Sequence, residues 1–379
     1  MSAERSNSCF HAIAGGKAVF LELLLWRRLI VFSGRIHLPT ASKSDYGNGF
    51  GMVDFDRIEK MIAAVPPALA LRAGLELGIF TRLGGGAQTA DSLGAALDVD
   101  PDRLSRLLYA LASIDLLEVV DGRFRNGAEA SAFLDASRST YRGGDHALLR
   151  ELWGADLLTA DSLRQNRPAA LHDFSEAGRE EAAAFSRMLA PGGVIFGRHL
   201  AQAMDLSATG SAIDIGGGAG TILVGLRERW PRISATLMEL PTVAAAAPDI
   251  LLEYGAGDVV VEEGDITLAP SAGRHDLAIL KAVVQVLPPD KARSAILNAA
   301  RCLNAGGEIA IAGWGVVDDG RLSPPEGVFL NLTFLNLYRH GEAYTEGQYR
   351  AWMTEAGFHD ISRSSLADGS TLFRARLAG

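Results

Sequence analysis

The segment AIDIGGGAG, residues 212–220, has the residue types of a ligand-binding turn. It is typical of an apolar strand that runs through Asp214 into a glycine-rich turn and then into a helix. Glycines let the backbone approach a ligand closely, and the helix that follows offers unpaired N–H groups and a positive dipole end. Glu239, about 20 positions later, is placed to accept hydrogen bonds from a ribose. The pattern predicts a site for an adenosine-containing cofactor, with Gly216, Gly217, Gly218 and Gly220 in its turn.

The spacing of these glycines excludes a dinucleotide fingerprint. In G-x-G-x-x-G the third glycine would fall at Thr221 or at Leu223, depending on the register, so the motif fails in both. The run fits D-x-G-G-G-x-G instead, which is typical of S-adenosylmethionine enzymes. That ligand has no pyrophosphate, and its methionine part needs a closely approaching backbone. The sequence therefore predicts an S-adenosylmethionine site.

Each part of that ligand has a candidate partner. We expect Asp214 to hold the loop or to meet the amino group of the methionine part, and Glu239 to take the ribose hydroxyls. Asp265, in the run EEGDI, would reach the adenine amino group, and Ile266 would pack on the ring. The alternative is a glycine-rich turn with an exposed carboxylate and no ligand.

Alternating strand and helix signals position these residues in an α/β domain. From Ser211 onward they predict a parallel sheet with short connections, closed at one edge by a hairpin of strands near 360–366 and 371–376. The other strands are expected at 211–215, 233–239, 258–262, 276–280 and 307–313. Helices are expected at 219–229, 242–253, 289–303, 326–338 and 345–356.

The N-terminal part is mainly helical. Two helices are expected over residues 54–83, then a helix capped by Thr89 and another capped by Asp100 with Pro101 at its first position. A small hairpin turns at Asp121-Gly122. Helix, helix and hairpin in this order predict a winged helix, and its many apolar residues favour dimerisation over DNA binding.

Four segments follow from these patterns. Residues 145–205 are helical throughout and are expected to bridge the domains and line a cleft. Residues 1–51 are expected to be a loosely attached extension, with Met52 as the natural start. A chain that begins at Met52 should then fold and stay active. The alternative is that residues 1–51 contribute a helix that docks on the partner subunit. The expected segments are 1–51, 52–144 (winged-helix dimerisation domain), 145–205 and 206–379 (cofactor domain).

Composition narrows the function classes. The net charge of −9 and the absence of a Lys/Arg run argue against a nucleic-acid partner. The apolar stretch 18–32 is short and contains three charges, which argues against a membrane span. The two cysteines, Cys9 and Cys302, allow neither a disulfide framework nor a metal cluster and predict a reducing cytoplasm.

Taken together, the runs IDIGGGAG, MELP, EGDI, LKAVVQVL and YTEGQYRAWMTEAGF resemble the caffeate/acetylserotonin-type small-molecule O-methyltransferases, which include bacterial polyketide-tailoring enzymes of secondary metabolism. The resemblance covers residues 54–379. It implies a class I methyltransferase (Rossmann-like) fold, a homodimer with interlocking N-terminal domains, and an aromatic or polyketide-like acceptor. It also places Leu240 and Lys281 beside the cofactor.

The sequence departs from this family at the catalytic base. Where most members carry a histidine after the fourth strand, Gln285 stands, and Leu287 replaces the family's tryptophan. The acidic residue usual at the end of the fifth strand is also missing from the run Ala312-Gly313-Trp314. Glutamine cannot act as a general base.

Three interpretations remain open. The enzyme methylates oxygen, or else carbon or nitrogen, mainly through proximity, and Gln285 orients the acceptor. Alternatively another residue is the base, with His340 as the first candidate and His146 and His199 as further ones. In the third, the cofactor is bound without methyl transfer, either in another reaction or in a cofactor-sensing winged-helix regulator.

Apolar side chains are expected to hold a flat acceptor ring. Five residues are candidates for this contact, although helix packing alone would also explain their spacing. They are Trp153, Met188, Asn331, Phe334 and Leu335.

Overall fold

The computed structural model describes residues 56–138, 140–141, 146–171 and 178–379, so the predicted extension 1–51 lies outside the described residues. The chain divides into two compact units, residues 1–62 and 63–379. In the first unit the helix α2 (Asp56–Ala63) begins, and it has no buried residue. All elements below belong to the second unit.

The helical N-terminal part forms as the capping signals predict. Thr89 accepts a hydrogen bond from the N–H of Ser92, and Asp100 accepts one from the N–H of Arg103. The helices enclose an apolar core that includes Phe80. The elements are α3 (Val65–Glu76), α4 (Ile79–Leu83), α5 (Ala90–Leu97), α6 (Pro101–Ala112), the hairpin β1 (Leu117–Val120) and β2 (Arg123–Asn126), and α7 (Ala128–Phe133). The predicted order of helix, helix and hairpin is present; the winged-helix assignment itself stays a prediction.

Three helices follow: α8 (His146–Asp156), α9 (Thr159–Gln165) and α10 (Arg179–Ala203). The helix α10 continues through Pro191. It packs closely on α11 (Thr221–Arg229), because a Cβ on Gly197 would lie 2.1 Å from the carbonyl oxygen of Ile222. Small residues at this contact let the two backbones touch.

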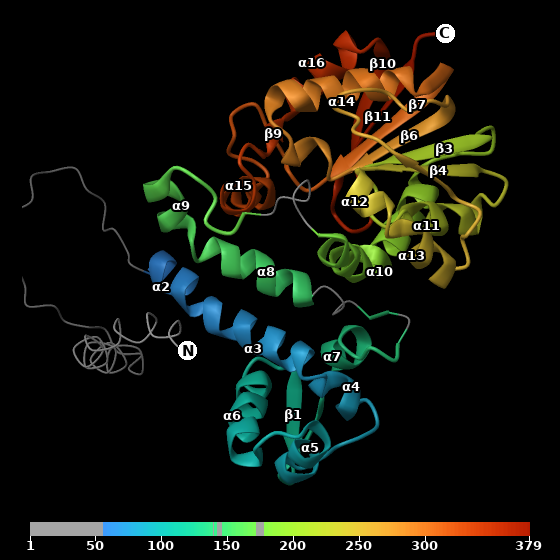
Figure 1. The fold of residues 1–379 in the computed structure, drawn as a ribbon. Coiled ribbons are helices and arrows are strands. Elements are labelled where there is room, and N and C mark those ends of the chain that lie inside the picture. The colour runs from blue at the N-terminus through green and yellow to red at the C-terminus, as the bar shows by residue number, and fades with distance from the viewer. Residues whose placement is uncertain (1–55, 139, 142–145, 172–177) are drawn as a thin grey trace, which may run out of the picture. The chain divides into compact units, whose positions relative to one another are not determined.

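A seven-stranded sheet forms the centre of the C-terminal part (Figure 1). Its order is β10-β11-β7-β6-β3-β4-β5, and the five strands from β7 to β5 run parallel. The sheet is mixed because β11 of the closing hairpin pairs antiparallel with β7 and with β10. The strands are β3 (Ser211–Ile215), β4 (Ser234–Glu239), β5 (Val260–Glu263), β6 (His275–Lys281), β7 (Leu303–Gly313), β10 (Phe358–Ser365) and β11 (Thr371–Leu377).

Helices cover both faces of this sheet. One face packs on α14 (Pro289–Arg301) and α16 (Glu346–Glu355), and the other on α10, α11 and α13 (Ala247–Glu253) (Figure 1). The sequence predicts one helix over 242–253, but the structure has two helices there, α12 (Pro241–Ala244) and α13. The break occurs because Pro248 lacks an N–H and is favoured in the first turn of a new helix. The remaining elements are η2 (Val284–Val286), β8 (Val316–Val317), α15 (Pro325–Leu337) and β9 (Tyr344–Thr345).

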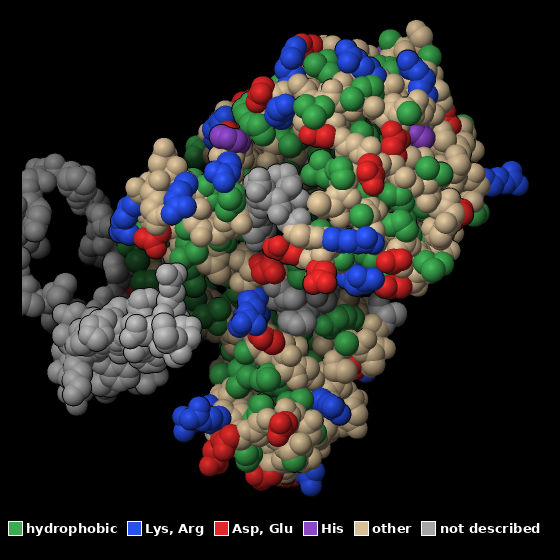
Figure 2. All heavy atoms as spheres, in the orientation of Figure 1, with side chains coloured by type: hydrophobic (Ala, Val, Ile, Leu, Met, Phe, Trp, Pro, Cys, Tyr) green, Lys and Arg blue, Asp and Glu red, His purple; other side chains and the backbone are tan. Residues whose placement is uncertain are grey.

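Two surface findings bear on partners. On the face drawn in Figure 2, basic and acidic side chains are interspersed rather than gathered into one basic patch. None of the helices in the described part of the chain has the length and apolar character needed to cross a membrane.

Candidate active site

The glycine turn after β3 has the backbone conformation that its sequence predicts. Gly216, Gly218 and Gly220 have φ values of 67°, 60° and 72°, which favour glycine. Gly217 is required for a different reason, because a Cβ there would lie 2.0 Å from Oδ2 of Asp214. The turn therefore exposes backbone next to a buried carboxylate.

Asp214 is fully buried, and within the described residues neither of its carboxylate oxygens has a hydrogen-bond partner. Burial raises the pKa of Asp214 to about 7, the charge of Glu239 adds to that increase, and the charge of Lys281 opposes it. A buried polar group without a partner costs free energy. A cationic group near the turn would favour the ionised form of this carboxylate.

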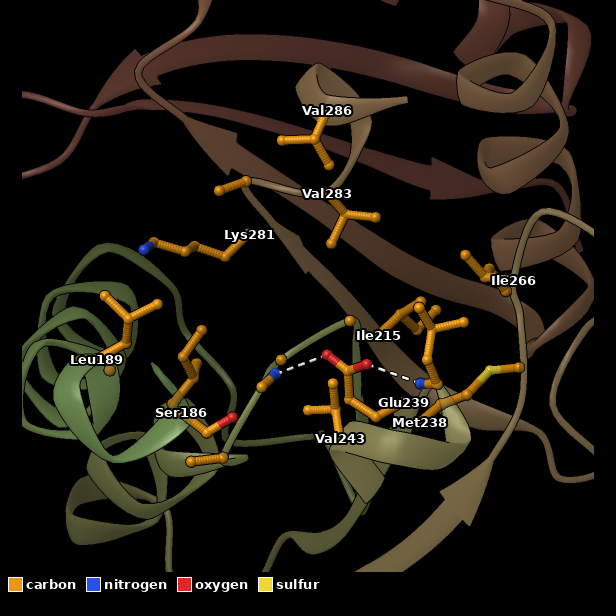
Figure 3. A pocket seen from close by; sticks show the side chains of 18 of the residues that line it. Ser186, Leu189, Ile215, Met238, Glu239, Val243, Ile266, Lys281, Val283 and Val286 are labelled. Carbon is orange, nitrogen blue, oxygen red and sulfur yellow. Dashed lines mark hydrogen bonds between the residues drawn. The ribbon is translucent and has the colours of Figure 1, made fainter. Parts of the chain in front are cut away.

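Glu239, at the end of β4, is held by the backbone on both of its oxygens. Oε1 accepts from the N–H of Gly218 at 2.9 Å, and Oε2 accepts from the N–H of Leu240 at 2.7 Å (Figure 3). Burial raises the pKa of Glu239, and the two N–H donors oppose that increase. Each oxygen keeps a lone pair that can accept from a ligand hydroxyl.

A cavity of about 340 Å³ opens beside these residues. Figure 3 shows Ser186 and Leu189 of α10 on one side, Glu239 near the glycine turn, and Val286 well away from Glu239. Lys281 extends from β6 toward α10, where its Nζ lies 5.8 Å from the ring centroid of Phe196. The lining is mainly apolar, with a few polar groups near the carboxyl ends of the parallel strands, which is the usual place for a ligand in such sheets.

Most of the predicted cofactor residues come together at this cavity. Asp214 lies behind the turn and is not a lining residue, and Gly220 faces Leu237 and Leu251. The predicted residues that do line the cavity are Gly216, Gly217, Gly218, Glu239, Leu240, Asp265, Ile266 and Lys281.

Gln285 lies close to the cavity but does not line it. Its side chain is buried, and Oε1 accepts from the N–H of Gly315 at 3.4 Å. A Cβ on Gly313 would lie 2.3 Å from this Oε1, so the amide fills the space that the two glycines leave. The next residues, Val286 and Leu287, face the cavity instead.

The histidines considered as bases are not brought to the cavity. His340 is exposed and is not a lining residue. His199 has its Nδ1 3.9 Å from a carboxylate oxygen of Asp368, and the side chain of His146 lies outside the described residues. The ionisable side chains among the described lining residues are those of Glu239, Asp265, Lys281 and Tyr338.

The predicted acceptor residues, Trp153, Met188, Asn331, Phe334 and Leu335, are all outside the lining set. Asn331 accepts instead from the N–H of Ala343 at 2.6 Å, and Phe334 is buried with its ring centroid 5.7 Å from that of Tyr338.

One face of α10 lines the cavity; of its members, only Phe185 is a cleft candidate from the sequence. Its members recur at helical spacing, which would have shown that Met188 points elsewhere. They are Ala182, Phe185, Ser186, Leu189, Ala190 and Gly193.

Comparisons with known proteins agree with this geometry. The profile of the O-methyltransferase domain matches residues 166–359, and that of the O-methyltransferase dimerisation domain matches residues 68–136. The chain is 27% identical to the 3-hydroxy-5-methyl-1-naphthoate 3-O-methyltransferase of Streptomyces sahachiroi, over 77% of this chain and 86% of that protein. It is 26% identical to aclacinomycin 10-hydroxylase RdmB of Streptomyces purpurascens, over 68% of this chain and 72% of that protein.

The structure of human N-acetylserotonin methyltransferase in complex with SAM has the same fold, with a TM-score of 0.72, 22% identity, and 87% of this chain and 100% of that chain covered. The two domain matches follow one another in chain order and cover the helical part and most of the sheet. The chain therefore belongs to the O-methyltransferase family, and it is a methyltransferase with the Rossmann-like fold and the dimerisation domain of that family.

Proposed function

We propose that the protein transfers the methyl group of S-adenosylmethionine to a hydroxyl oxygen of a small aromatic or polyketide-like acceptor. The observation that carries this proposal is one cavity that is lined by most of the predicted cofactor residues and continues into an apolar region. S-adenosylmethionine supplies an electrophilic methyl group on its sulfonium. An aromatic hydroxylated acceptor agrees with the naphthoate acceptor named for the Streptomyces sahachiroi relative.

The residues of the turn have separate binding roles in this proposal. The carboxylate of Asp214, which has no hydrogen-bond partner among the described residues, lies directly behind the backbone of Gly217, from where its charge attracts the ammonium group of the methionine part. The backbone-held carboxylate of Glu239 accepts from the ribose hydroxyls. Asp265 and Ile266 line the cavity at the place proposed for the adenine.

Deprotonation of the acceptor does not depend on a histidine in this proposal, since none of the described lining residues is a histidine. An acidic phenol or enol arrives ionised, and the cavity holds its oxygen in line with the methyl group. Such positioning supplies about 7 kcal/mol or more of the barrier reduction in favourable cases.

The proposed reaction is tested with methyl-labelled S-adenosylmethionine and a panel of naphthols, phenols, enols and amines. We expect labelled methyl ethers and an equal amount of S-adenosylhomocysteine with the acidic hydroxyl compounds. The matched variant Glu239→Gln should keep the fold and lose most of its cofactor affinity. Labelled product from amines alone would replace O-methylation by N-methylation.

A second candidate is a reaction in which bound S-adenosylmethionine is not consumed. Gln285 at the position of the family base favours it, as does the similarity to a protein named as a hydroxylase. Tight cofactor binding without S-adenosylhomocysteine release for any acceptor would support this candidate over methyl transfer.

We also propose that the active form is a cytoplasmic homodimer. The dimerisation domain supports the homodimer. The cytoplasmic location rests on the sequence, whose two cysteines, Cys9 and Cys302, lie far apart and offer no disulfide framework.

A further inference from the structure

Tyr338 lines the cavity, and it has no role in the cofactor contacts proposed above. It directly follows α15 and lines the cavity together with Val286 and Leu287. The loop after it packs on η2, because a Cβ on Gly341 would lie 3.1 Å from the backbone oxygen of Gln285. Tyr338 therefore reaches the cavity from beside the position of the family base, where the side chain of Gln285 is turned toward Gly315.

The ring of Tyr338 is held on two sides. Its centroid is 5.7 Å from that of Phe334, and a Cβ on Gly341 would lie 2.9 Å from its Cδ2. The helix before it is fixed by Asn336, which is fully buried and exchanges hydrogen bonds with Ser162 and Thr159. A ring held in this way presents its hydroxyl in a defined place, which is what orienting a ligand requires.

The hydroxyl of Tyr338 makes no hydrogen bond to any described residue of the chain. Burial raises the pKa of Tyr338 to about 12, so the hydroxyl stays protonated at neutral pH and can donate. Because no described residue accepts from this hydroxyl, its donor is available to an oxygen of a bound ligand.

From this geometry we infer that Tyr338 donates a hydrogen bond to an oxygen of the aromatic acceptor and thereby selects hydroxylated rings over unsubstituted ones. The inference rests on the proposed function for the identity of the ligand. A site that hydrogen-bonds a ligand oxygen discriminates against an analogue that lacks this oxygen. When such an analogue binds, the protein hydroxyl is left without a hydrogen-bond partner.

The test compares two probes, 2-naphthol and naphthalene, binding to the S-adenosylhomocysteine-loaded protein in calorimetric titrations. Tyr338→Phe keeps the ring and removes only the hydroxyl. We expect it to weaken 2-naphthol by about 5- to 10-fold and to leave naphthalene unchanged. Ser186→Ala is the matched control, since Ser186 is another cavity-lining hydroxyl, across the cavity from Val286 in Figure 3, and its loss should leave the ratio of the two affinities unchanged.

Other outcomes overturn the inference. They are an unchanged ratio of the two affinities in Tyr338→Phe, an equal loss of affinity for both probes, or no binding of 2-naphthol to the wild-type protein. Unchanged S-adenosylhomocysteine affinity and melting temperature in Tyr338→Phe serve as folding checks. Methyl transfer to 2-naphthol is measured separately. If Tyr338→Phe lowers the preference for 2-naphthol over naphthalene but the protein does not methylate 2-naphthol, the inference stands and the proposed reaction is rejected. If the protein methylates 2-naphthol but Tyr338→Phe leaves the preference unchanged, the proposed reaction stands and the inference is rejected.

Discussion

Two buried acids beside the glycine turn differ in how they are satisfied. Glu239 accepts backbone N–H bonds on both oxygens, whereas Asp214 has no partner for either oxygen in the described structure. The first is a preformed acceptor for ligand hydroxyls. The second is a carboxylate whose ionisation is unfavourable until a cation arrives, and its raised pKa of about 7 expresses that cost.

Cofactor affinity should therefore depend on the ionisation of Asp214. As pH rises from about 6 to about 8, Asp214 loses its proton and affinity for S-adenosylmethionine should increase, until the ligand's own α-amino group, with a pKa of about 8, deprotonates. Calorimetric titration in buffers of different ionisation enthalpy measures both the affinity and the proton released. Asp214→Asn should bind weakly with no such increase; an unchanged pH profile in this variant would refute the assignment.

The free protein should show the opposite trend in stability. The folded-state pKa of Asp214 is raised above its unfolded value, so the folded protein holds this proton between about pH 4 and about pH 7. The contribution of Asp214 to stability is full below that window and is lost as pH rises through it. Denaturant titrations of the free protein and of Asp214→Asn should separate this contribution, which the variant lacks.

Gly217→Ala should disturb the cofactor site by displacing the turn or the carboxylate behind it. The added Cβ would lie 2.0 Å from Oδ2 of Asp214, so either the turn or the carboxylate must move. We expect a loss of about 1–3 kcal/mol in stability, typical of overpacking, and at least about 10-fold weaker S-adenosylhomocysteine binding. Gly192→Ala on α10 is the matched control, because a Cβ there meets no atom within 4 Å. Equal cofactor affinity in the two variants would contradict the close approach.

Single residues differ in how far the sequence could predict them. Of the cofactor residues, Glu239 lies at the end of a strand and Asp265 lies two residues after one, and a strand end fixes where its next residues lie, so both could be located. Phe334 and Met188 lie in helices, where choosing the wrong face moves a side chain to the other side of the element. Gln285 could be recognised as a departure, but its orientation depends on Gly313 and Gly315, which are distant in sequence.

Among the elements, α15 depends on a buried polar network. Asn336 accepts from the hydroxyl of Ser162 at 2.6 Å and donates to Thr159 Oγ1 at 2.9 Å and to the backbone oxygen of Leu332 at 2.8 Å. These bonds join α9 to α15 and so place the residue that follows α15 at the cavity. Spacing alone could not reveal this pairing, since its partners are more than 170 positions apart.

Removal of this network should destabilise the protein. Asn336→Ala leaves the hydroxyl of Ser162 without its acceptor in a buried place, and we expect a loss of about 2–3 kcal/mol of unfolding free energy in urea. Leu332→Ala, at a half-exposed position on the same helix, should cost less than about 1 kcal/mol. Equal losses in the two variants would show that the network does not stabilise α15.

The elements themselves follow closely from sequence. Strand β3 has the predicted bounds, the capped helices α5 and α6 begin where Thr89 and Asp100 predict, and the closing hairpin forms. Capping and alternation are local signals, which explains this agreement. The continuity of α10 through Pro191 is less evident from sequence, because it depends on the close packing of α10 on α11.

For the whole molecule, the dimerisation domain predicts self-association through an apolar surface. On α3, the apolar side chains of Val65 and Leu69 are 55% and 48% exposed in the single chain, so they are available to contact a second copy. Leu69→Glu should shift the protein toward the monomer mass in analytical ultracentrifugation. Leu268→Glu, at a position that is 70% exposed and outside that domain, is the control and should leave the mass unchanged. A dimer of unaltered affinity in Leu69→Glu would place the interface elsewhere.

Methyl transfer without a protein base is the central claim, and one measurement tests it most directly. It is the pH dependence of kcat/KM at saturating S-adenosylmethionine for a series of naphthols whose hydroxyl pKa values differ. We predict that the midpoint of each profile follows the pKa of the acceptor, because the ionised acceptor reacts and the cavity only positions it. A common midpoint for all acceptors, set by a group of the protein, would contradict the claim.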